Sequence, residues 1–363
     1  MKKSDLNNLV RDNIKKLQPY SSARTEYSGE ASVFLDANEN SYGSALDNLP
    51  SSIEEGQRVR FNRYPDPLQW DLKNALSKIK GIPAQNIFIG NGSDEVIDLV
   101  IRIFCEPAKS NIITCPPTYG MYKVCANIND VPVKEINLTT DFQLDVERIL
   151  ESIDLNTRVL FLCSPNNPTG NNMNRMDIEL LINNFPGIVI IDEAYINYSR
   201  QKTFLQELTE YENLIVMQTL SKAWGLAALR LGLAFASEKI IELFNKVKPP
   251  YNINISSQQL GLKALSGIEQ VNSNIKNTVE QRSFLQQELK QFNFIKEIYP
   301  SDANFILIRT DDADKLYQYL SAQKIIVRNR SKEPLCENCI RVTVGTPNEN
   351  EILIETLKHY RNA

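Results

Sequence analysis

The middle of the chain alternates short apolar runs with amphipathic stretches, and this alternation constrains the fold most strongly. The apolar runs cover residues 86–90, 111–115, 158–163, 188–192, 214–219 and 231–236. Several are apolar throughout rather than at every second position, as in strands of a sheet covered on both faces. Residues 93–104, between the first two runs, place their apolar side chains on one helical face. The pattern predicts an α/β core with a mostly parallel central sheet covered by helices.

The pattern changes after about residue 240. A long polar helical stretch is predicted over 256–291, followed by strand-like runs at 304–309, 324–328 and 340–344. A helix is expected between the first two of these runs and another at the end of the chain. We therefore predict three parts: an N-terminal arm over 1–45 lying over the body, a large α/β domain over 46–245, and a smaller C-terminal α+β domain over 246–363.

Charge and histidine content exclude several classes of function. The chain of 363 residues has 40 Lys and Arg against 44 Asp and Glu, so it lacks the basic excess of a nucleic-acid binder. Its single histidine, His359, lies near the C-terminus in a predicted helical tail, and we interpret it as a surface residue. Catalysis by a Ser-His-Asp or Cys-His set, and most catalytic zinc sites, are excluded. Proton transfer must then use lysine, carboxylate, tyrosine or a cofactor.

The expected compartment is the cytoplasm. No run of about 20 apolar residues predicts a membrane span, and the first residues are charged, without the apolar core of a secretory signal. The six cysteines are expected to be thiols. Cys336 and Cys339 have the spacing of half a zinc site, but no second pair follows. We interpret them as two thiols in a polar loop and expect no metal.

The segment Thr219–Gly232 is the most informative motif. Lys222 directly follows an apolar run, next to Ser221, and Arg230 stands eight residues further on. Lysine is rarely buried unless it is paired or has reacted, and at such a place it can form a Schiff base with an aldehyde. Ser221 and Arg230 then suit a phosphate on the same ligand. A serine–lysine pair taken alone would indicate only an ordinary surface lysine.

Two further motifs follow other predicted strands. Asp192 ends the run 188–192, where its carboxylate can pair with a pyridinium nitrogen, and Tyr195 can donate to a ring oxygen. The alternative is that Asp192 caps a helix. Asn167 lies in the proline-rich turn 163–170, where its amide can reach a phenolic oxygen. Here the alternative is a plain loop before a helix.

A glycine-rich turn leads into the predicted helix 93–104. Gly92, Ser93 and Asp94 stand at its start, where free N–H groups and the positive end of the helix dipole favour a phosphate. The turn matches neither a P-loop nor a dinucleotide-binding motif, so it does not imply nucleotide binding.

Three more residues complete the set. Tyr119 can stack on a flat ring. Arg341 lies in the last strand-like run and suits bidentate capture of a carboxylate or phosphate, and Arg328 ends the run before it. Together the motifs predict one ligand with an aldehyde, a pyridinium nitrogen, a phenolic oxygen and a phosphate, which is pyridoxal 5′-phosphate.

The sequence resembles the pyridoxal-phosphate-dependent aminotransferases of fold type I, and within them the histidinol-phosphate aminotransferase family. The resemblance covers nearly the whole chain and rests on motifs at 19–24 (PYSSAR), 35–39 (LDANE), 62–65 (NRYP), 90–95 (GNGSDE), 115–122 (CPPTYGMY), 163–170 (CSPNNPTG), 192–195 (DEAY), 219–232 (TLSKAWGLAALRLG) and 341–346 (RVTVGT). It implies transfer of an amino group from L-histidinol phosphate to 2-oxoglutarate, giving imidazole acetol phosphate and L-glutamate, in histidine biosynthesis.

The resemblance also implies a role for each site residue. Lys222 corresponds to the Schiff-base lysine and proton shuttle, Asp192 to the partner of the ring nitrogen, and Tyr119 to the stacking residue. Asn167 and Tyr195 would bind the phenolic oxygen. The implied cofactor-phosphate residues are Gly92, Ser93, Asp94, Ser221, Arg230 and, from the neighbouring subunit, Tyr64. A homodimer with shared active sites follows from Tyr64.

The implied substrate residues are Tyr20, Asn38, Asn167, Arg328 and Arg341. A site that takes both a phosphorylated amine and a carboxylate benefits from more than one arginine, although Arg328 can also be read as a surface salt-bridge partner. Trp224 and Ala228 depart from the family pattern, and residues 41–60 match it poorly, which bears on side-chain specificity.

Three alternatives remain at this point. Two belong to the same branch: an aromatic amino-acid aminotransferase and a threonine-phosphate decarboxylase. The third is a pyridoxal-phosphate-binding transcription regulator, although no additional DNA-binding domain fits in front of the motifs.

Overall fold

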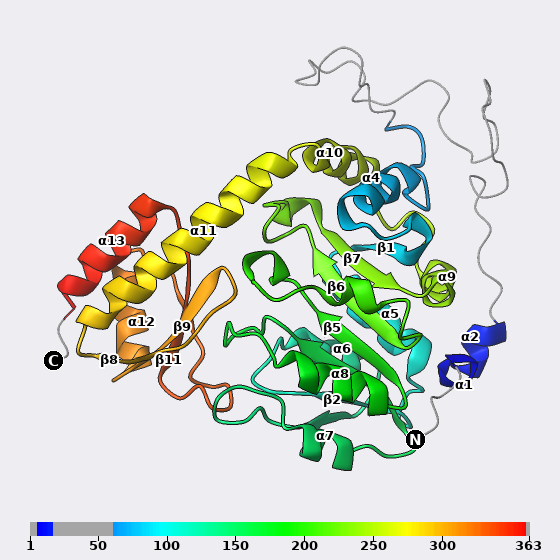
Figure 1. Cartoon of the computed structure of the whole chain (residues 1–363), viewed down its shortest axis with the longest axis horizontal. Coiled ribbons are helices and arrows are strands. Elements are labelled where there is room, and N and C mark those ends of the chain that lie inside the picture. The colour runs from blue at the N-terminus through cyan, green and yellow to red at the C-terminus, as the bar shows by residue number, and fades with distance from the viewer. Residues whose placement is uncertain (1–5, 17–60, 361–363) are drawn as a thin grey trace.

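The computed structural model describes residues 6–16 and 61–360, and a seven-stranded sheet forms its centre (Figure 1). The strands are β1 (Ile87–Asn91), β2 (Asn111–Thr114), β3 (Val133–Glu135), β4 (Thr157–Cys163), β5 (Ile188–Asp192), β6 (Leu214–Thr219) and β7 (Leu231–Ala236). Their order is β1-β7-β6-β5-β4-β2-β3, with only β7 antiparallel to its neighbours. The prediction of a mostly parallel sheet is confirmed.

Helices cover both faces of this sheet, and strand residues alternate between two apolar cores. The covering helices are α4 (Trp70–Lys80), α5 (Ser93–Phe104), α6 (Met121–Ile128), α7 (Val146–Glu151), α8 (Arg175–Asn184) and α9 (Glu238–Val247). In β5, Val189 and Ile191 pack with α4, α7 and α8, whereas Ile188 and Ile190 pack with α5, α6 and α9. Burial on both faces explains why these strands are apolar throughout.

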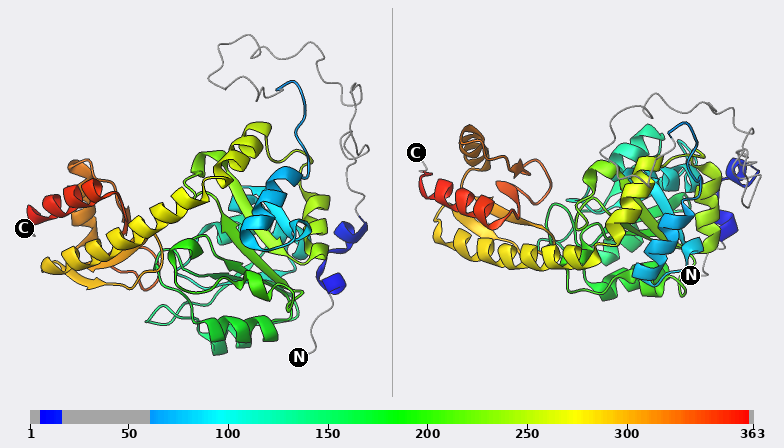
Figure 2. Two further views of the ribbon diagram at one scale, coloured as in Figure 1. Left: turned by 45° about the horizontal axis from the view of Figure 1, so that its top comes forward. Right: turned by 90° about the horizontal axis from the view of Figure 1, so that it is seen from above.

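A second, smaller sheet follows a long helix. The C-terminal elements are α10 (Ile255–Leu265), α11 (Ile268–Glu288), β8 (Ile295–Ile298), β9 (Phe305–Thr310), α12 (Ala313–Ala322), β10 (Arg328–Asn329), β11 (Cys339–Thr343) and α13 (Pro347–Lys358). The sheet is antiparallel, in the order β10-β11-β9-β8. Figures 1 and 2 show α11 running from beside the large sheet to the small one. The predicted α+β C-terminal part is confirmed.

Short 3₁₀ helices complete the described secondary structure. They are η1 (Ala84–Asn86), η2 (Ile196–Tyr198), η3 (Phe204–Glu207), η4 (Ala227–Leu229) and η5 (Leu289–Gln291). The helix predicted over 256–291 is therefore α10, α11 and η5, with a break at Ser266–Gly267 between the first two.

Some predicted details were wrong. The strand predicted at 324–328 is reduced to β10, because Ile326 is 74% exposed and Lys324 has a positive φ of 63°. Cys336 and Cys339 are not in polar surroundings: both are fully buried, Cys336 in the loop before β11 and Cys339 at the start of that strand. His359 directly follows α13 and is exposed, as predicted.

Residues 6–16 lie against the large domain. They form α1 (Leu6–Leu9) and α2 (Asp12–Lys16), whose apolar side chains join the core shared by α5 and α9. The backbone N–H of Arg11 donates to the carbonyl oxygen of Ile103 at 3.1 Å. The predicted division at 245 falls within α9, and the three-part division of the chain stays a prediction.

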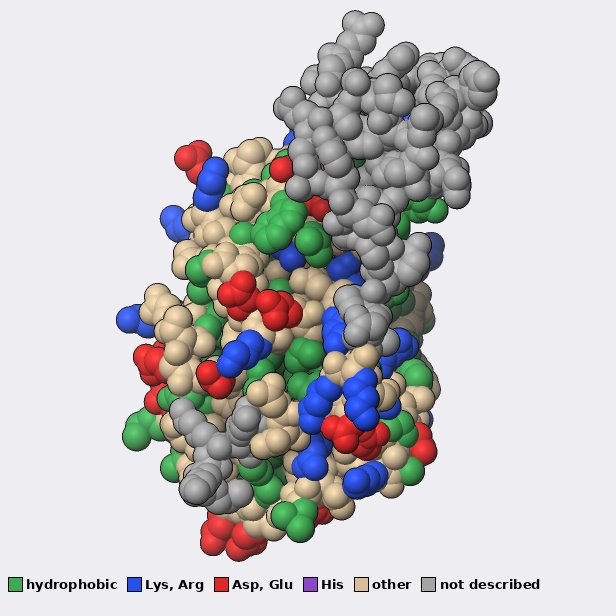
Figure 3. All heavy atoms as spheres, turned by 90° about the vertical axis from the view of Figure 1, so that its right-hand side faces the viewer, with side chains coloured by type: hydrophobic (Ala, Val, Ile, Leu, Met, Phe, Trp, Pro, Cys, Tyr) green, Lys and Arg blue, Asp and Glu red, His purple; other side chains and the backbone are tan. Residues whose placement is uncertain are grey.

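The described helices contain none with the length and apolar character that a membrane crossing requires. On the face drawn in Figure 3, positive and negative side chains are interspersed. Residues 6–16 and 61–360 also contain no group of three or more His, Cys, Asp or Glu residues arranged to hold a metal ion.

Candidate active site

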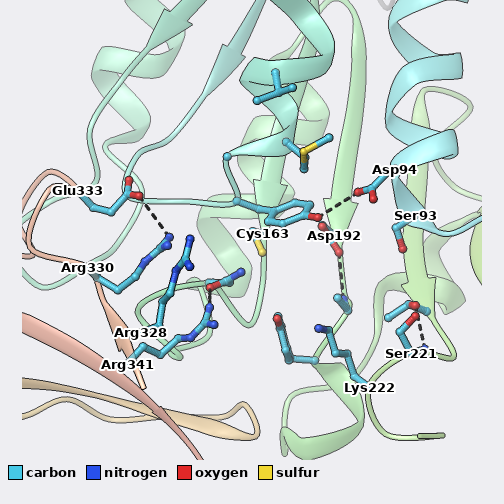
Figure 4. Close-up of a pocket in the computed structure, with 18 of the residues that line it drawn as sticks. Ser93, Asp94, Cys163, Asp192, Ser221, Lys222, Arg328, Arg330, Glu333 and Arg341 are labelled. Carbon is cyan, nitrogen blue, oxygen red and sulfur yellow. Dashed lines mark hydrogen bonds and ion pairs between the residues drawn. The ribbon is translucent and has the colours of Figure 1, made fainter. Parts of the chain in front are cut away.

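A cavity of about 610 Å³ lies between the carboxyl edge of the large sheet and the small sheet (Figure 4). Cys163, Asp192 and Thr219 end β4, β5 and β6 and all line it, because the ends of parallel strands meet at one edge. The other lining residues are Ser93, Asp94, Tyr119, Gly120, Met121, Val124, Asn167, Ala194, Tyr195, Ser221, Lys222, Arg230, Arg328, Arg330, Glu333 and Arg341.

Lys222 lies on a fixed turn that follows β6. The turn is held by hydrogen bonds from the Gly225 N–H to the Lys222 carbonyl and from the Leu226 N–H to the Leu220 carbonyl, both 3.0 Å. Burial lowers the pKa of Lys222, and the cations Arg341 and Arg230 lower it further. A lowered pKa favours the neutral amine, which is the form that attacks an aldehyde or accepts a proton.

Asp192 is buried with both carboxylate oxygens hydrogen-bonded. Its Oδ2 accepts from the hydroxyl of Tyr122 at 2.7 Å, and its Oδ1 accepts from the N–H of Ala194 at 3.1 Å. Burial raises the pKa of Asp192, whereas these two hydrogen bonds lower it. The two hydrogen bonds therefore favour the carboxylate form of Asp192 against the effect of burial, and a cationic nitrogen beside that carboxylate would be stabilised.

Tyr122 is a site residue that the sequence analysis missed. It lies on α6, is fully buried, and its ring meets that of Tyr119 edge-on, with centroids 5.5 Å apart. The second tyrosine of the motif 115–122 was the available signal: Tyr119 precedes α6, and Tyr122 lies in its first turn.

The side chains of Asn167, in the turn after β4, and Arg341, in β11 of the small sheet, contact each other. Arg341 donates through Nη1 to Oδ1 of Asn167, so the amide NH₂ of Asn167 remains available as a donor. Tyr195 lies beside them with its ring edge-on to Phe305, at a centroid distance of 5.1 Å. Burial raises the pKa of Tyr195, which keeps its hydroxyl protonated. Two neutral donors therefore face the cavity.

The N-terminus of α5 and Arg230 form the opposite wall. Gly92 caps the helix with φ of 79°, and a Cβ added there would collide with the Arg230 guanidinium. Arg230 lies 3.6 Å from the carboxylate of Asp94, which accepts a 3.0 Å hydrogen bond from the hydroxyl of Tyr119. A helix N-terminus, a guanidinium and the nearby hydroxyl of Ser93 suit an anion such as phosphate.

The third wall is a group of arginines on the small sheet. Arg328 of β10 stands opposite Arg341 of β11 in the antiparallel register, so the two side chains share one face. Arg330 and Glu333, which the sequence analysis did not identify, line the cavity beside them and form an ion pair at 3.3 Å. Arg330 lies two positions after Arg328, and this period-two spacing was the signal.

The remaining predicted residues lie elsewhere. Tyr64 is 51% exposed and stacks on Tyr251 at a centroid distance of 4.4 Å, outside the cavity of its own chain. Tyr20 and Asn38 lie outside the described residues. The structure therefore brings together Lys222, Asp192 and the other described site residues except Tyr64, and their individual roles stay predictions.

Comparisons with known proteins agree with this arrangement. The family model of the class I and II aminotransferases matches residues 32–357. The histidinol-phosphate aminotransferases of Cytophaga hutchinsonii and Bacteroides thetaiotaomicron are each 51% identical to the chain, and each match covers 98% of this chain and 99% of the relative.

Solved structures share the fold. The histidinol-phosphate aminotransferase of Clostridium acetobutylicum superimposes with a TM-score of 0.76 at 24% identity, over 82% of this chain and 90% of that one. The Sinorhizobium meliloti enzyme of the same name, in complex with pyridoxal-5′-phosphate, gives 0.74 at 21% identity, over 82% and 83%. The predicted fold type I architecture is confirmed, and the chain belongs to the class I and II aminotransferase family.

Proposed function

We propose that this chain is a pyridoxal-phosphate-dependent aminotransferase that interconverts L-histidinol phosphate and 2-oxoglutarate with imidazole acetol phosphate and L-glutamate, in histidine biosynthesis. The observation that carries the proposal is one cavity that is lined together by Lys222, with its lowered pKa, by the buried Asp192 and by the arginines of the small sheet. Curated histidinol-phosphate aminotransferases at 51% identity over nearly the whole chain support it.

The cavity fits pyridoxal 5′-phosphate. The α5 N-terminus with Arg230, Ser93 and Ser221 would hold its phosphate, and Asp192 would hold its ring nitrogen. When bound, this cofactor supplies an aldehyde and an electron-withdrawing ring. The glycine required at position 92, where any side chain would displace Arg230, supports this use of the wall.

The side chains of the protein would then bind the ligands and transfer protons. The lowered pKa of Lys222 favours its neutral amine, the form that can attack a carbonyl carbon and afterwards accept and return a proton. The hydroxyl of Tyr122 and the N–H of Ala194 favour the carboxylate form of Asp192, which would stabilise positive charge beside it. Asn167 and Tyr195 donate hydrogen bonds to an oxygen in the cavity.

The arginine wall supports the choice of substrates. A phosphorylated amine and glutamate present a phosphate and a carboxylate respectively, and guanidinium groups bind both in bidentate fashion. We infer that Arg341 and Arg328 bind whichever anion is present. We further propose that the protein is cytoplasmic and a homodimer. The exposed position of Tyr64, away from its own cavity, supports the homodimer, in which Tyr64 would reach the neighbouring site.

Turnover with defined amino donors tests this function. The purified protein loaded with pyridoxal 5′-phosphate should form glutamate from 2-oxoglutarate with L-histidinol phosphate far faster than with phenylalanine, and should release no CO₂ from threonine phosphate. Faster turnover of phenylalanine would assign an aromatic aminotransferase, and CO₂ release a decarboxylase.

Replacing the lysine tests the mechanism. Lys222→Ala should lower kcat by at least about 10³-fold, because no other amine lines the cavity among the described residues. The exposed Lys239→Ala is the matched control and should retain the wild-type kcat. Near-normal turnover by Lys222→Ala would contradict the mechanism.

A further inference from the structure

Arg330 shares the cavity wall with Arg328 and Arg341, although neither the motifs nor the proposed mechanism uses it. It directly follows β10, and its backbone N–H donates to the carbonyl oxygen of Cys339 in β11 at 2.8 Å. This bond continues the strand pairing by one residue, and residues two apart on a strand point to the same face. Figure 4 shows the three guanidinium groups side by side.

The charges at this wall do not balance. Three arginines line it with one carboxylate, Glu333, which lies 3.3 Å from Arg330. Arg330 and Arg328 both lower the pKa of Arg341, after the larger effect of burial. The side chain of Arg330 is only 14% exposed, so solvent screens its charge weakly. The wall therefore has a surplus of two positive charges and favours an anion of matching charge.

Unused hydrogen-bond donors lie at the same place. The Nε atoms of Arg330 and Arg341 are buried and have no hydrogen-bond partner among the described residues. Buried donors without partners cost free energy, and a ligand with several acceptor oxygens removes that cost. A phosphate monoester has three terminal oxygens and carries about 1.5 to 2 negative charges near pH 7, whereas a carboxylate has two oxygens and one charge.

We propose that Arg330 is a specificity-determining residue that favours the dianionic phosphoryl group of the amino donor over the carboxylate of the second substrate, with Glu333 holding its guanidinium against the wall. This inference rests on the proposed function, since it assumes that one cavity receives both substrates. Arg341 and Arg328 suffice for a monoanion. Arg330 adds the charge and donors that only a phosphoryl group uses fully.

The experiment compares Arg330→Gln, Glu333→Gln and Lys332→Gln in the full-length protein loaded with its cofactor. Lys332 is exposed on the same loop and does not line the cavity, so its loss controls for charge alone. Two quantities are measured: the dissociation constant of inorganic phosphate, by titration calorimetry, and KM and kcat for L-histidinol phosphate and for glutamate.

Arg330→Gln should weaken phosphate binding about tenfold and raise the KM for L-histidinol phosphate about tenfold more than the KM for glutamate. Glu333→Gln removes the one negative charge and should tighten phosphate binding roughly threefold. Lys332→Gln should change phosphate binding by less than about twofold. Arg330→Lys should restore part of the phosphate affinity, because it keeps the charge and loses the planar fork.

Equal changes in both KM values, or unchanged phosphate binding in Arg330→Gln, would overturn the inference and leave Arg330 as a structural partner of Glu333. A different result would contradict the proposed function without contradicting this inference. If the wild-type protein does not turn over L-histidinol phosphate but Arg330→Gln still weakens phosphate binding, the inference stands for another phosphorylated amine.

Discussion

At the scale of single residues, Tyr122 opposes the effect of burial on the pKa of Asp192. Its hydroxyl is the donor to Oδ2 of that carboxylate at 2.7 Å, and its ring stacks on Phe161 at a centroid distance of 4.7 Å. Tyr122→Phe keeps the ring and removes the donor. Because burial already raises the pKa of Asp192 and the hydroxyl opposes that rise, the variant should raise the pKa further.

The expected result is a shift in the pH profile. Asp192 would be protonated at a higher pH, so the acidic limb of kcat/KM for Tyr122→Phe should move to higher pH, with a loss of roughly 10- to 100-fold at the low end. Tyr198→Phe, a buried tyrosine that does not line the cavity, should leave the limb in place. An unchanged acidic limb in Tyr122→Phe would show that Ala194 alone supports the carboxylate.

The sequence predicted the site residues that lie in recognisable motifs, but not those that act on the site through a contact with another side chain. Lys222 and Asp192 directly follow or end apolar strands, so their placement at the sheet edge was predictable. Tyr122 was missed because it serves the site through a contact with Asp192, which lies 70 positions further along the chain. Arg330 was missed although its partner Glu333 is only three residues away, because none of the recognised motifs contains it. Arg330 in addition lies outside any regular element.

At the scale of elements, β7 and the start of α5 approach each other closely. A Cβ added at Gly232 would collide with the backbone of Gly92 and Ser93, and backbone cannot move aside as a flexible side chain can. Gly232→Ala should therefore destabilise the protein by about 1–3 kcal/mol or more and lower its apparent melting temperature by several degrees.

Calorimetry of the variant and of Gly120→Ala checks this expectation. Gly120 has an ordinary φ of −65° and open space around its added Cβ, so its replacement should hardly change the melting temperature. Equal melting temperatures of Gly232→Ala and the wild-type protein would contradict the close approach.

Strands were predictable from the sequence where burial on both faces requires a continuous run of apolar residues. The runs predicted in the large sheet correspond to six of its strands within one residue or so, because both faces are buried. β3 and β8 were not predicted, since both are short and only partly buried. At 324–328 the apolar residues suggested a strand, but Ile326 is exposed and pairing begins only at Arg328.

At the scale of the whole molecule, Tyr64 allows a test of the proposed homodimer with shared active sites. Neither Tyr64→Phe nor Lys222→Ala should be fully active alone, but mixed dimers of the two would place both changes in one site and leave the other intact. Random exchange in an equal mixture should make about a quarter of all sites intact. Activity is measured after partial unfolding and refolding together, with the separately refolded variants as controls. Activity no higher than the mean of these controls would show that each site uses only its own chain.

The 21-residue helix α11 joins the body that holds Lys222 to the sheet that holds Arg341, and it spans about 32 Å. In a helix of that length, a small change of angle moves the far end a long way. A tilt of about 5° at the Gly267 end would displace the other end by about 3 Å, which is several times the range over which a hydrogen-bond distance can vary. Two hydrogen bonds of 2.7 Å hold this region in place: Arg282 donates to the Ala303 carbonyl, and the Asp302 N–H donates to the Gly170 carbonyl. They therefore fix the position of the small sheet, and with it the distance of its arginines from Lys222.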